Sequence, residues 1–171
     1  KEMPASIAIL GAGAIGAEFA YFLNAFGCKV TLIEMLPKVL PVEDAEISKA
    51  LATAFDKQGI ICRVNTRVDE IEVVEDGVSL TLNGEKGEES IMVDSVLLAI
   101  GVVPNLQGLF SDKCKVELDR GYIKVDENYQ TSLPQVFATG DVVGPPWLAH
   151  VATFRAVQAV NGMFEHAKPI P

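Results

Sequence analysis

The stretch SIAILGAGAIGAEFAYFLNAFGCKVTLIE, residues 6–34, decides the fold of this chain. It opens with a short apolar run at 7–10 and continues through GAGAIG into a helical pattern that stops at Gly27. A second apolar run follows at 30–33 and ends on Glu34, eighteen residues after the last glycine of the motif. The order strand, glycine turn, helix, strand and acid predicts a parallel βαβ unit.

The three glycines of this unit suit a bound dinucleotide. Gly11 permits the tight turn out of the strand, Gly13 leaves the backbone open to a pyrophosphate, and Gly16 lets the helix pack closely on the sheet. The free N–H groups and the positive dipole end at the helix start would face the phosphates. An ordinary glycine turn is the alternative, but the strand–helix context and the acid favour the dinucleotide.

Glu34 bears on which dinucleotide is bound. Its carboxylate can accept hydrogen bonds from both ribose hydroxyls of an adenosine, and its charge would repel a 2′-phosphate. No Lys or Arg follows it until Lys38, so a cationic clamp for such a phosphate is not evident. The motif therefore favours NAD over NADP, whereas it does not separate NAD from FAD, since both carry the same ADP half.

Composition narrows the function classes. The net charge of −9 argues against nucleic acid as a partner, because such binding draws on clustered Lys and Arg. No apolar stretch is long enough for a membrane span, and no signal peptide is evident. The cysteines, Cys28, Cys62 and Cys114, form no CxxC pair, and histidine occurs only at 150 and 166, so neither a dithiol nor a metal site is predicted. A reducing, cytoplasmic location fits this pattern.

The rest of the chain divides into two parts. A helix capped by Asp44 and ended by Gly59 leads to a third strand at 60–64, after which alternating patterns predict an antiparallel meander at 68–74, 78–82 and 91–93. An apolar strand at 96–100 completes this α/β fold with its parallel sheet. Beyond it the patterns predict three elements: a short strand at 122–125, a buried strand at 136–141, and a helix from about 151 to 165.

Several motifs now coincide with those of one family. GAGAIGAE, the acid after the next strand, AIG before PN, TSLPQVFATGDV and PPWLAH occur in the order that dihydrolipoamide dehydrogenases show. The chain thus resembles the pyridine nucleotide–disulfide oxidoreductase family over nearly all of its 171 residues. The resemblance implies a Rossmann-like NAD-binding domain at 1–104, with an antiparallel β-meander crossover, and the closing segment of an FAD-binding domain at 105–171. It also implies that the chain is a piece of a longer protein.

The resemblance assigns roles to individual residues. In the NAD-binding part, Glu18 would approach the nicotinamide amide, Val68 would lie near the adenine, and Gly101 would approach the nicotinamide side. In the FAD-binding part, Asp141 would hold a ribityl hydroxyl, and the turn at 147–150 would point a helix at the flavin. The implied cofactor-binding residues are Gly11, Ala12, Gly13, Ala14, Ile15, Gly16, Ala17, Glu18, Glu34, Val68, Gly101, Asp141, Trp147, Leu148, Ala149 and His150.

Simpler interpretations exist for some of these residues. Glu18 would also suit a solvated helix acid, and Val68 would also suit a core position. His150 would also suit an ordinary residue at a helix start, because nothing in the sequence supplies it with a general-base partner.

The resemblance also implies what the chain does not do alone. The family needs a first FAD glycine loop, a redox-active CxxxxC disulfide and a dimerisation domain with a His–Glu pair, and this sequence contains none of them. No catalytic residue is therefore expected here. The intact parent would pass electrons from dihydrolipoamide through the disulfide and FAD to NAD. The resemblance implies a homodimer that can belong to a 2-oxoacid dehydrogenase complex.

Other functions remain open at this point. Within the family, an NADH-linked peroxidase, a coenzyme A-disulfide reductase or a ferredoxin reductase would use the same NAD motif. Outside it, a non-catalytic nucleotide-binding module would also fit. The sequence upstream of Lys1 would distinguish them, because a CxxxxC favours a disulfide reductase and a single cysteine favours a peroxidase.

Overall fold

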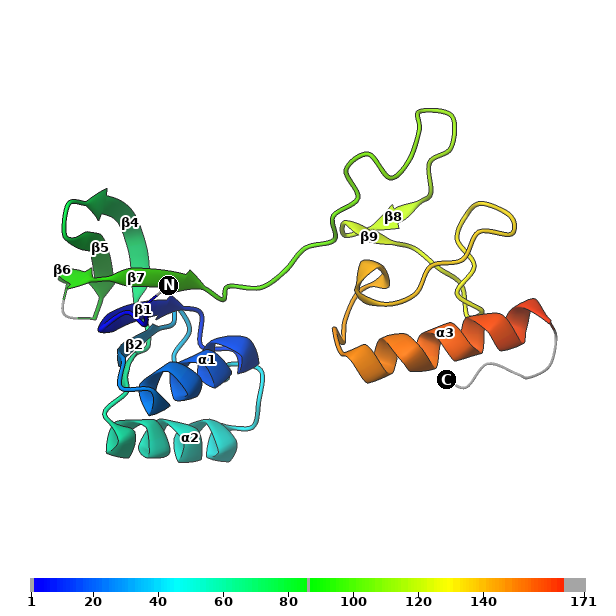
Figure 1. Cartoon of the computed structure of the whole chain (residues 1–171). Coiled ribbons are helices and arrows are strands. Elements are labelled where there is room, and N and C mark those ends of the chain that lie inside the picture. Colours follow the sequence, from blue (N-terminus) through cyan, green and yellow to red (C-terminus); the bar gives the residue numbers. More distant parts are fainter. Residues whose placement is uncertain (1, 86, 165–171) are drawn as a thin grey trace. The chain divides into compact units, whose positions relative to one another are not determined.

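A computed structural model of the chain describes residues 2–85 and 87–164 (Figure 1). The chain separates into two compact units, with the boundary between Gly101 and Val102. This boundary lies close to the predicted one at 104, while the assignment of the two parts to NAD and FAD domains stays a prediction. Among the described residues, no helix has the length and apolarity needed to cross a membrane.

The first unit is built on a parallel sheet with strand order β3-β2-β1-β7. Two crossovers are helical, and the third is an antiparallel sheet in the order β4-β5-β6. The elements are β1 (Ser6–Leu10), α1 (Ala14–Ala25), β2 (Lys29–Ile33), α2 (Ala45–Gln58), β3 (Ile61–Arg63), β4 (Arg67–Val74), β5 (Gly77–Gly84), β6 (Gly87–Val93) and β7 (Ser95–Leu98). The predicted α/β fold and its meander crossover are confirmed, with strand ends shifted by at most four residues, the largest shift being at the start of β6.

Three layers result, because the parallel sheet is covered on both faces. Figure 1 shows α1 and α2 side by side on one face of the sheet, with β4, β5 and β6 on the other. In β1, Ile7 and Ile9 belong to the core on the helix side, whereas Ala8 and Leu10 belong to the core against Leu80 and other residues of the meander. Burial on both faces explains why this strand reads as a continuous apolar run.

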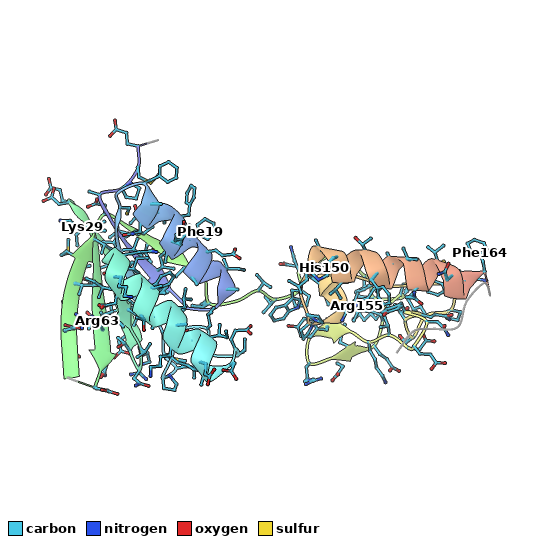
Figure 2. All side chains as sticks on the ribbon, turned by 90° about the horizontal axis from the view of Figure 1, so that it is seen from below. Phe19, Lys29, Arg63, His150, Arg155 and Phe164 are labelled. Carbon is cyan, nitrogen blue, oxygen red and sulfur yellow. The ribbon has the colours of Figure 1, made fainter. Side chains whose placement is uncertain are left out.

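The face of α1 that meets the sheet is made of small residues. Gly16, Ala17 and Ala20 are buried, and a Cβ on Gly16 would lie 1.9 Å from the carbonyl oxygen of Gly11. The large apolar residues of the helix mostly point outward: Ile15, Phe19, Phe22 and Phe26 are all exposed (Figure 2 labels Phe19). The helix therefore contacts the sheet through close backbone approach, and its larger apolar stripe is not the core face.

The second crossover helix begins and ends as its sequence predicts. The Asp44 carboxylate accepts a hydrogen bond from the Glu46 N–H at 2.7 Å, which caps α2. At the other end Gly59 adopts the left-handed conformation, with φ of 82°. The Ser48 hydroxyl, which is buried, bonds to the Leu40 carbonyl and fastens the helix to the loop before it.

The second unit contains little regular structure besides one helix. Its elements are β8 (Leu118–Asp119), β9 (Tyr122–Ile123), the 3₁₀ turn η1 (Asp141–Val143) and α3 (Ala149–Met163). Arg155 of α3 donates hydrogen bonds to the carbonyls of Gly144 at 2.9 Å and Pro145 at 2.8 Å, so the helix is held against the preceding loop (Figure 2). The predicted helix end near Glu165 lies outside the described residues.

The strand predicted at 136–141 is wrong. Only an isolated bridge joins Phe137 to Gln130, and Val136 is exposed. Two backbone hydrogen bonds join the segment to residues 129–131, from the Thr131 N–H to the Val136 carbonyl and from the Ala138 N–H to the Tyr129 carbonyl. The neighbouring chain turns at Tyr129, where φ is 63°, so the pairing does not continue beyond it. A strand needs a longer ladder of neighbouring hydrogen bonds than this short pairing provides.

Candidate functional site

A cavity of about 630 Å³ opens where the strands of the parallel sheet end. Five of the predicted residues line it together: Gly11, Gly13, Glu34, Val68 and Gly101. They follow the carboxyl ends of β1, β2 and β7 or belong to the start of β4. The chain leaves β1 towards β2 on one side and returns as β7 on the other, and such a switch point is where open α/β sheets bind ligands.

The glycines of the first turn have separable roles. Gly11 has φ of 99°, and a Cβ on it would lie 2.4 Å from the carbonyl oxygen of Ala99, so only glycine fits there. Gly13 has an ordinary φ of −68° and its Cβ would meet no atom within 4 Å. Packing therefore does not demand glycine at 13. The open space beside its backbone, on the cavity side, is what a pyrophosphate would need.

The start of α1 leaves its amides available. Gly13 is the N-cap, no side chain caps the helix, and no acid occupies the first turn. The first intrahelical bond runs from the Ala17 N–H to the Gly13 carbonyl at 2.9 Å, so the N–H groups before it have no partner within the helix. Together with the positive end of the helix dipole, they form a site suited to an anion.

Glu34 is held firmly at the cavity wall. Its Oε2 accepts a hydrogen bond from the Ala12 N–H at 2.8 Å, and its Oε1 accepts one from the Leu36 N–H at 2.9 Å. Its own backbone bonds to the Arg63 carbonyl and the Thr66 N–H. A carboxylate offers about four acceptor positions. Two are used by the backbone, so one acceptor site on each oxygen is left for a pair of hydroxyl donors.

Apart from Val68, sequence reasoning missed the residues at and near the start of β4 that line the cavity. Residues 66–71 line it, including the ion pair of Arg67 and Asp69, whose Nε and Oδ1 lie 2.5 Å apart. The Arg67 guanidinium, by its hydrogen bond and then its charge, holds the pKa of the Asp69 carboxyl below its usual value. The position of Arg67 in the sequence could have revealed it, because it follows the third parallel strand and the carboxyl ends of parallel strands share one edge of a sheet.

Other predicted residues of the loop do not line this cavity. Ala12, Gly16 and Ala17 are buried, and the role of Ala12 is to donate to Glu34. The remaining three, Ala14, Ile15 and Glu18, are exposed on α1. Their contact with a nucleotide stays a prediction.

In the second unit, two of the five predicted residues come together. Asp141 and Trp147 share a cavity of about 280 Å³ with Tyr122 and residues 102–105. The Tyr122 and Trp147 rings pack at 6.3 Å between centroids. Leu148 is the N-cap of α3, and Ala149 and His150 lie in its first turn, exposed and outside the residues that line this cavity (Figure 2 labels His150).

The cysteines take no part in either cavity. Cys28 is buried, and Cys62 is half-buried against the same core. Burial, with a smaller effect of the Asp94 charge, raises the pKa of the Cys28 thiol, and burial followed by Asp56 does the same for Cys62. Both thiols are therefore kept in their neutral, unreactive form.

Comparison with known proteins identifies the family of the chain. The model of the family described as pyridine nucleotide-disulphide oxidoreductase matches residues 1–156. A dihydrolipoyl dehydrogenase from Chlorobaculum tepidum is 40% identical over 164 residues, which cover 95% of this chain and 35% of that protein. The chain therefore spans about a third of the length of the relatives it matches.

Two solved structures superpose on nearly the whole chain. LpdA from Mycobacterium tuberculosis gives a TM-score of 0.89 at 30% identity, covering 99% of this chain and 37% of that one. The HOCl-induced flavoprotein disulfide reductase RclA from Escherichia coli gives 0.87 at 29% identity, covering 99% and 38%.

The fold and the first cavity define a class, that of Rossmann-like α/β proteins with a ligand site at the switch point of the sheet. Within this class, the chain belongs to the pyridine nucleotide-disulphide oxidoreductase family.

Proposed function

We propose that this chain is the NAD(H)-binding part, and one wall of the FAD site, of a flavin-dependent disulfide oxidoreductase of the dihydrolipoamide dehydrogenase type. The observation that carries the proposal is the single cavity lined by Gly11, Gly13, Glu34, Val68 and Gly101. An acid, an open glycine and an uncapped helix start meet there, which is the set of groups that an adenosine ribose and a pyrophosphate require.

Each part of the cavity has a separate task. The amides at the start of α1 bind the pyrophosphate beside the open Gly13. Glu34 accepts the ribose hydroxyls, and its two bonds to backbone amides keep its carboxylate oriented. Val68 and neighbouring apolar residues of β4 contact the adenine. The bound nucleotide supplies the hydride acceptor or donor, and the protein's part is to hold and orient it.

The second unit supplies less of a site. Asp141 accepts a flavin hydroxyl and the start of α3 directs its dipole at the flavin, while the ADP half of FAD is bound by parts of the parent that this chain does not include. We therefore expect no lipoamide-linked NADH oxidation from the chain by itself. The intact parent, a homodimer and part of a 2-oxoacid dehydrogenase complex, oxidises dihydrolipoamide with NAD.

Titration of the chain with NADH and NADPH tests the proposal. We expect tighter binding of NADH, because the Glu34 charge repels the 2′-phosphate. Glu34→Ala should weaken NADH by about ten- to a hundredfold, equivalent to the roughly 1.5–3 kcal/mol of hydrogen bonds to a charged group. It should also reduce the difference in binding affinity between NADH and NADPH.

Two further measurements control this experiment. Glu34→Gln keeps an acceptor oxygen for one of the two backbone amides and removes the charge, so it should narrow the difference in affinity between NADH and NADPH with a smaller loss of NADH affinity than Glu34→Ala. Equal or tighter binding of NADPH by the unchanged chain would contradict the proposal. A yellow cofactor retained in equal amount after purification would contradict the assignment of the second unit.

A further inference from the structure

The nucleotide cavity contains an ion pair that the proposed function does not yet use. Arg67 and Asp69 both line it, together with Glu34. Arg67 directly follows Thr66, whose N–H donates to the Glu34 carbonyl at 2.9 Å. An arginine near the ribose acid is the residue type that would bind a 2′-phosphate. The charge of this arginine is, however, already matched by a carboxylate.

The geometry of the pair favours a persistent contact. The Arg67 Nε and Asp69 Oδ1 are 2.5 Å apart, and the other carboxylate oxygen accepts from the Asn83 Nδ2 at 3.3 Å. Asn83 is the cross-strand partner of Arg67, while Asp69 lies at the β-bulge between Val68 and Glu70, so one residue of β5 contacts both members of the pair. The Asp69 side chain is 29% exposed, against 62% for Arg67. The acid is therefore the less exposed partner, and the hydrogen bond from Arg67 lowers its pKa.

Two other cations that flank Glu34 are also engaged. Arg63, whose carbonyl accepts from the Glu34 N–H, lies 3.7 Å from a Glu89 carboxylate oxygen. Lys38 donates to the Glu43 carbonyl. Neither of these two lines the cavity, which leaves Arg67 as the cation best placed at this corner among the described residues.

Resting on the proposed function, we infer that Asp69 is a second specificity determinant for NAD over NADP, acting by neutralising Arg67 at the ribose corner. Glu34 repels a 2′-phosphate directly. Asp69 removes the attraction that Arg67 would otherwise exert on it. Changing Glu34 alone therefore leaves the preference only partly reversed, and changing both acids reverses it further.

The experiment compares Asp69→Asn with the unchanged 171-residue chain. Asparagine keeps the size of the side chain and an acceptor for Arg67, and removes one charge. We expect the affinity for NADPH relative to NADH to rise about five- to tenfold, the effect on a phosphate dianion of one charge about 6 Å away in water-like dielectric. A rise of the same size is expected in the affinity for adenosine 2′,5′-bisphosphate relative to adenosine 5′-monophosphate. These two ligands differ only in the 2′-phosphate.

Three variants make the result decisive. Glu72→Gln removes one exposed carboxylate from the same strand outside the cavity, and should leave the ratio unchanged. Arg67→Met alone should lower the affinity for NADPH relative to NADH, because it leaves the Asp69 charge unmatched and repulsive to a 2′-phosphate. In the double variant Arg67→Met with Asp69→Asn, the rise in relative NADPH affinity predicted for Asp69→Asn should disappear. Higher salt should shrink the gain in Asp69→Asn, because the charges are solvent-accessible.

The outcomes distinguish failure of the proposed function from failure of the inference about Asp69. If the unchanged chain binds no NADH, the proposed function and this inference are both overturned. If it prefers NADH but Asp69→Asn moves the ratio no more than Glu72→Gln does, the inference alone is overturned. If the rise in relative NADPH affinity persists in the double variant that lacks Arg67, the inference is overturned as well. Circular dichroism of each variant confirms that the titrations compare folded proteins.

Discussion

Replacing Gly13 by alanine should separate nucleotide binding from folding in this chain. The added Cβ would meet no atom within 4 Å, and the backbone φ of −68° is ordinary for alanine. Alanine stiffens the unfolded chain, which stabilises by about 0.4–1 kcal/mol, but it is a poorer N-cap by a similar amount. The free energy of unfolding should thus stay within about 1 kcal/mol of the unchanged chain.

Binding should respond quite differently. The methyl group would occupy the space beside the first amides of α1, where the proposed pyrophosphate lies. We expect NADH affinity to fall about tenfold or more, equivalent to about 1.4 kcal/mol. Urea unfolding followed by circular dichroism measures stability, and fluorescence titration with NADH measures binding.

Gly16→Ala is the matched control, because it adds the same methyl group three residues further on. Its Cβ would lie 1.9 Å from the Gly11 carbonyl oxygen, so α1 must move away from the turn. We expect a loss of stability of about 1–3 kcal/mol. NADH binding by Gly13→Ala at the unchanged affinity would refute the position given to the pyrophosphate. An equal loss of stability in both variants would refute the packing argument.

Two further predictions concern other parts of the first unit. The Asp94 carboxylate accepts hydrogen bonds from the Ser6 N–H at 3.0 Å and the Ala5 N–H at 2.7 Å, and these bonds, that of Ser6 first, lower its pKa. The ionised Asp94 therefore stabilises the fold fully above the ordinary aspartate pKa of about 3.9, and this stabilisation is lost as the pH falls through the lowered pKa. Between pH 6 and pH 3, the melting temperature of Asp94→Asn should fall less than that of the unchanged chain. Identical pH profiles for the two proteins would contradict this. Iodoacetamide should modify exposed Cys114 in the native chain and leave Cys28, which is 2% exposed, intact until urea is added; mass spectrometry of the peptides would disprove this by finding early modification of Cys28.

The sequence by itself determined the order and type of elements in the first unit. Apolar runs that are buried on both faces, such as residues 7–10, read as strands without help from their neighbours. Local signals did the same for the ends of α2, where Asp44 caps and Gly59 terminates. The positions of Gly11 and Glu34 at two strand ends were enough to predict that they would meet, because parallel strands place their carboxyl ends at one edge.

Only the tertiary structure decided the rest. The sequence shows α1 to be apolar on more than one side, and which side meets the sheet depends on backbone approach, so Gly16 and Ala20 are buried while Phe19 is exposed. Residues 136–141 have the pattern of a strand, but their pairing with residues 129–131 stops where the chain turns at Tyr129. The ion pair of Arg67 and Asp69 enters the cavity because β4 starts beside Glu34, a contact set by hydrogen bonds between segments distant in the chain. Periodicity reports local backbone preference, whereas these three features depend on which partner another part of the chain provides.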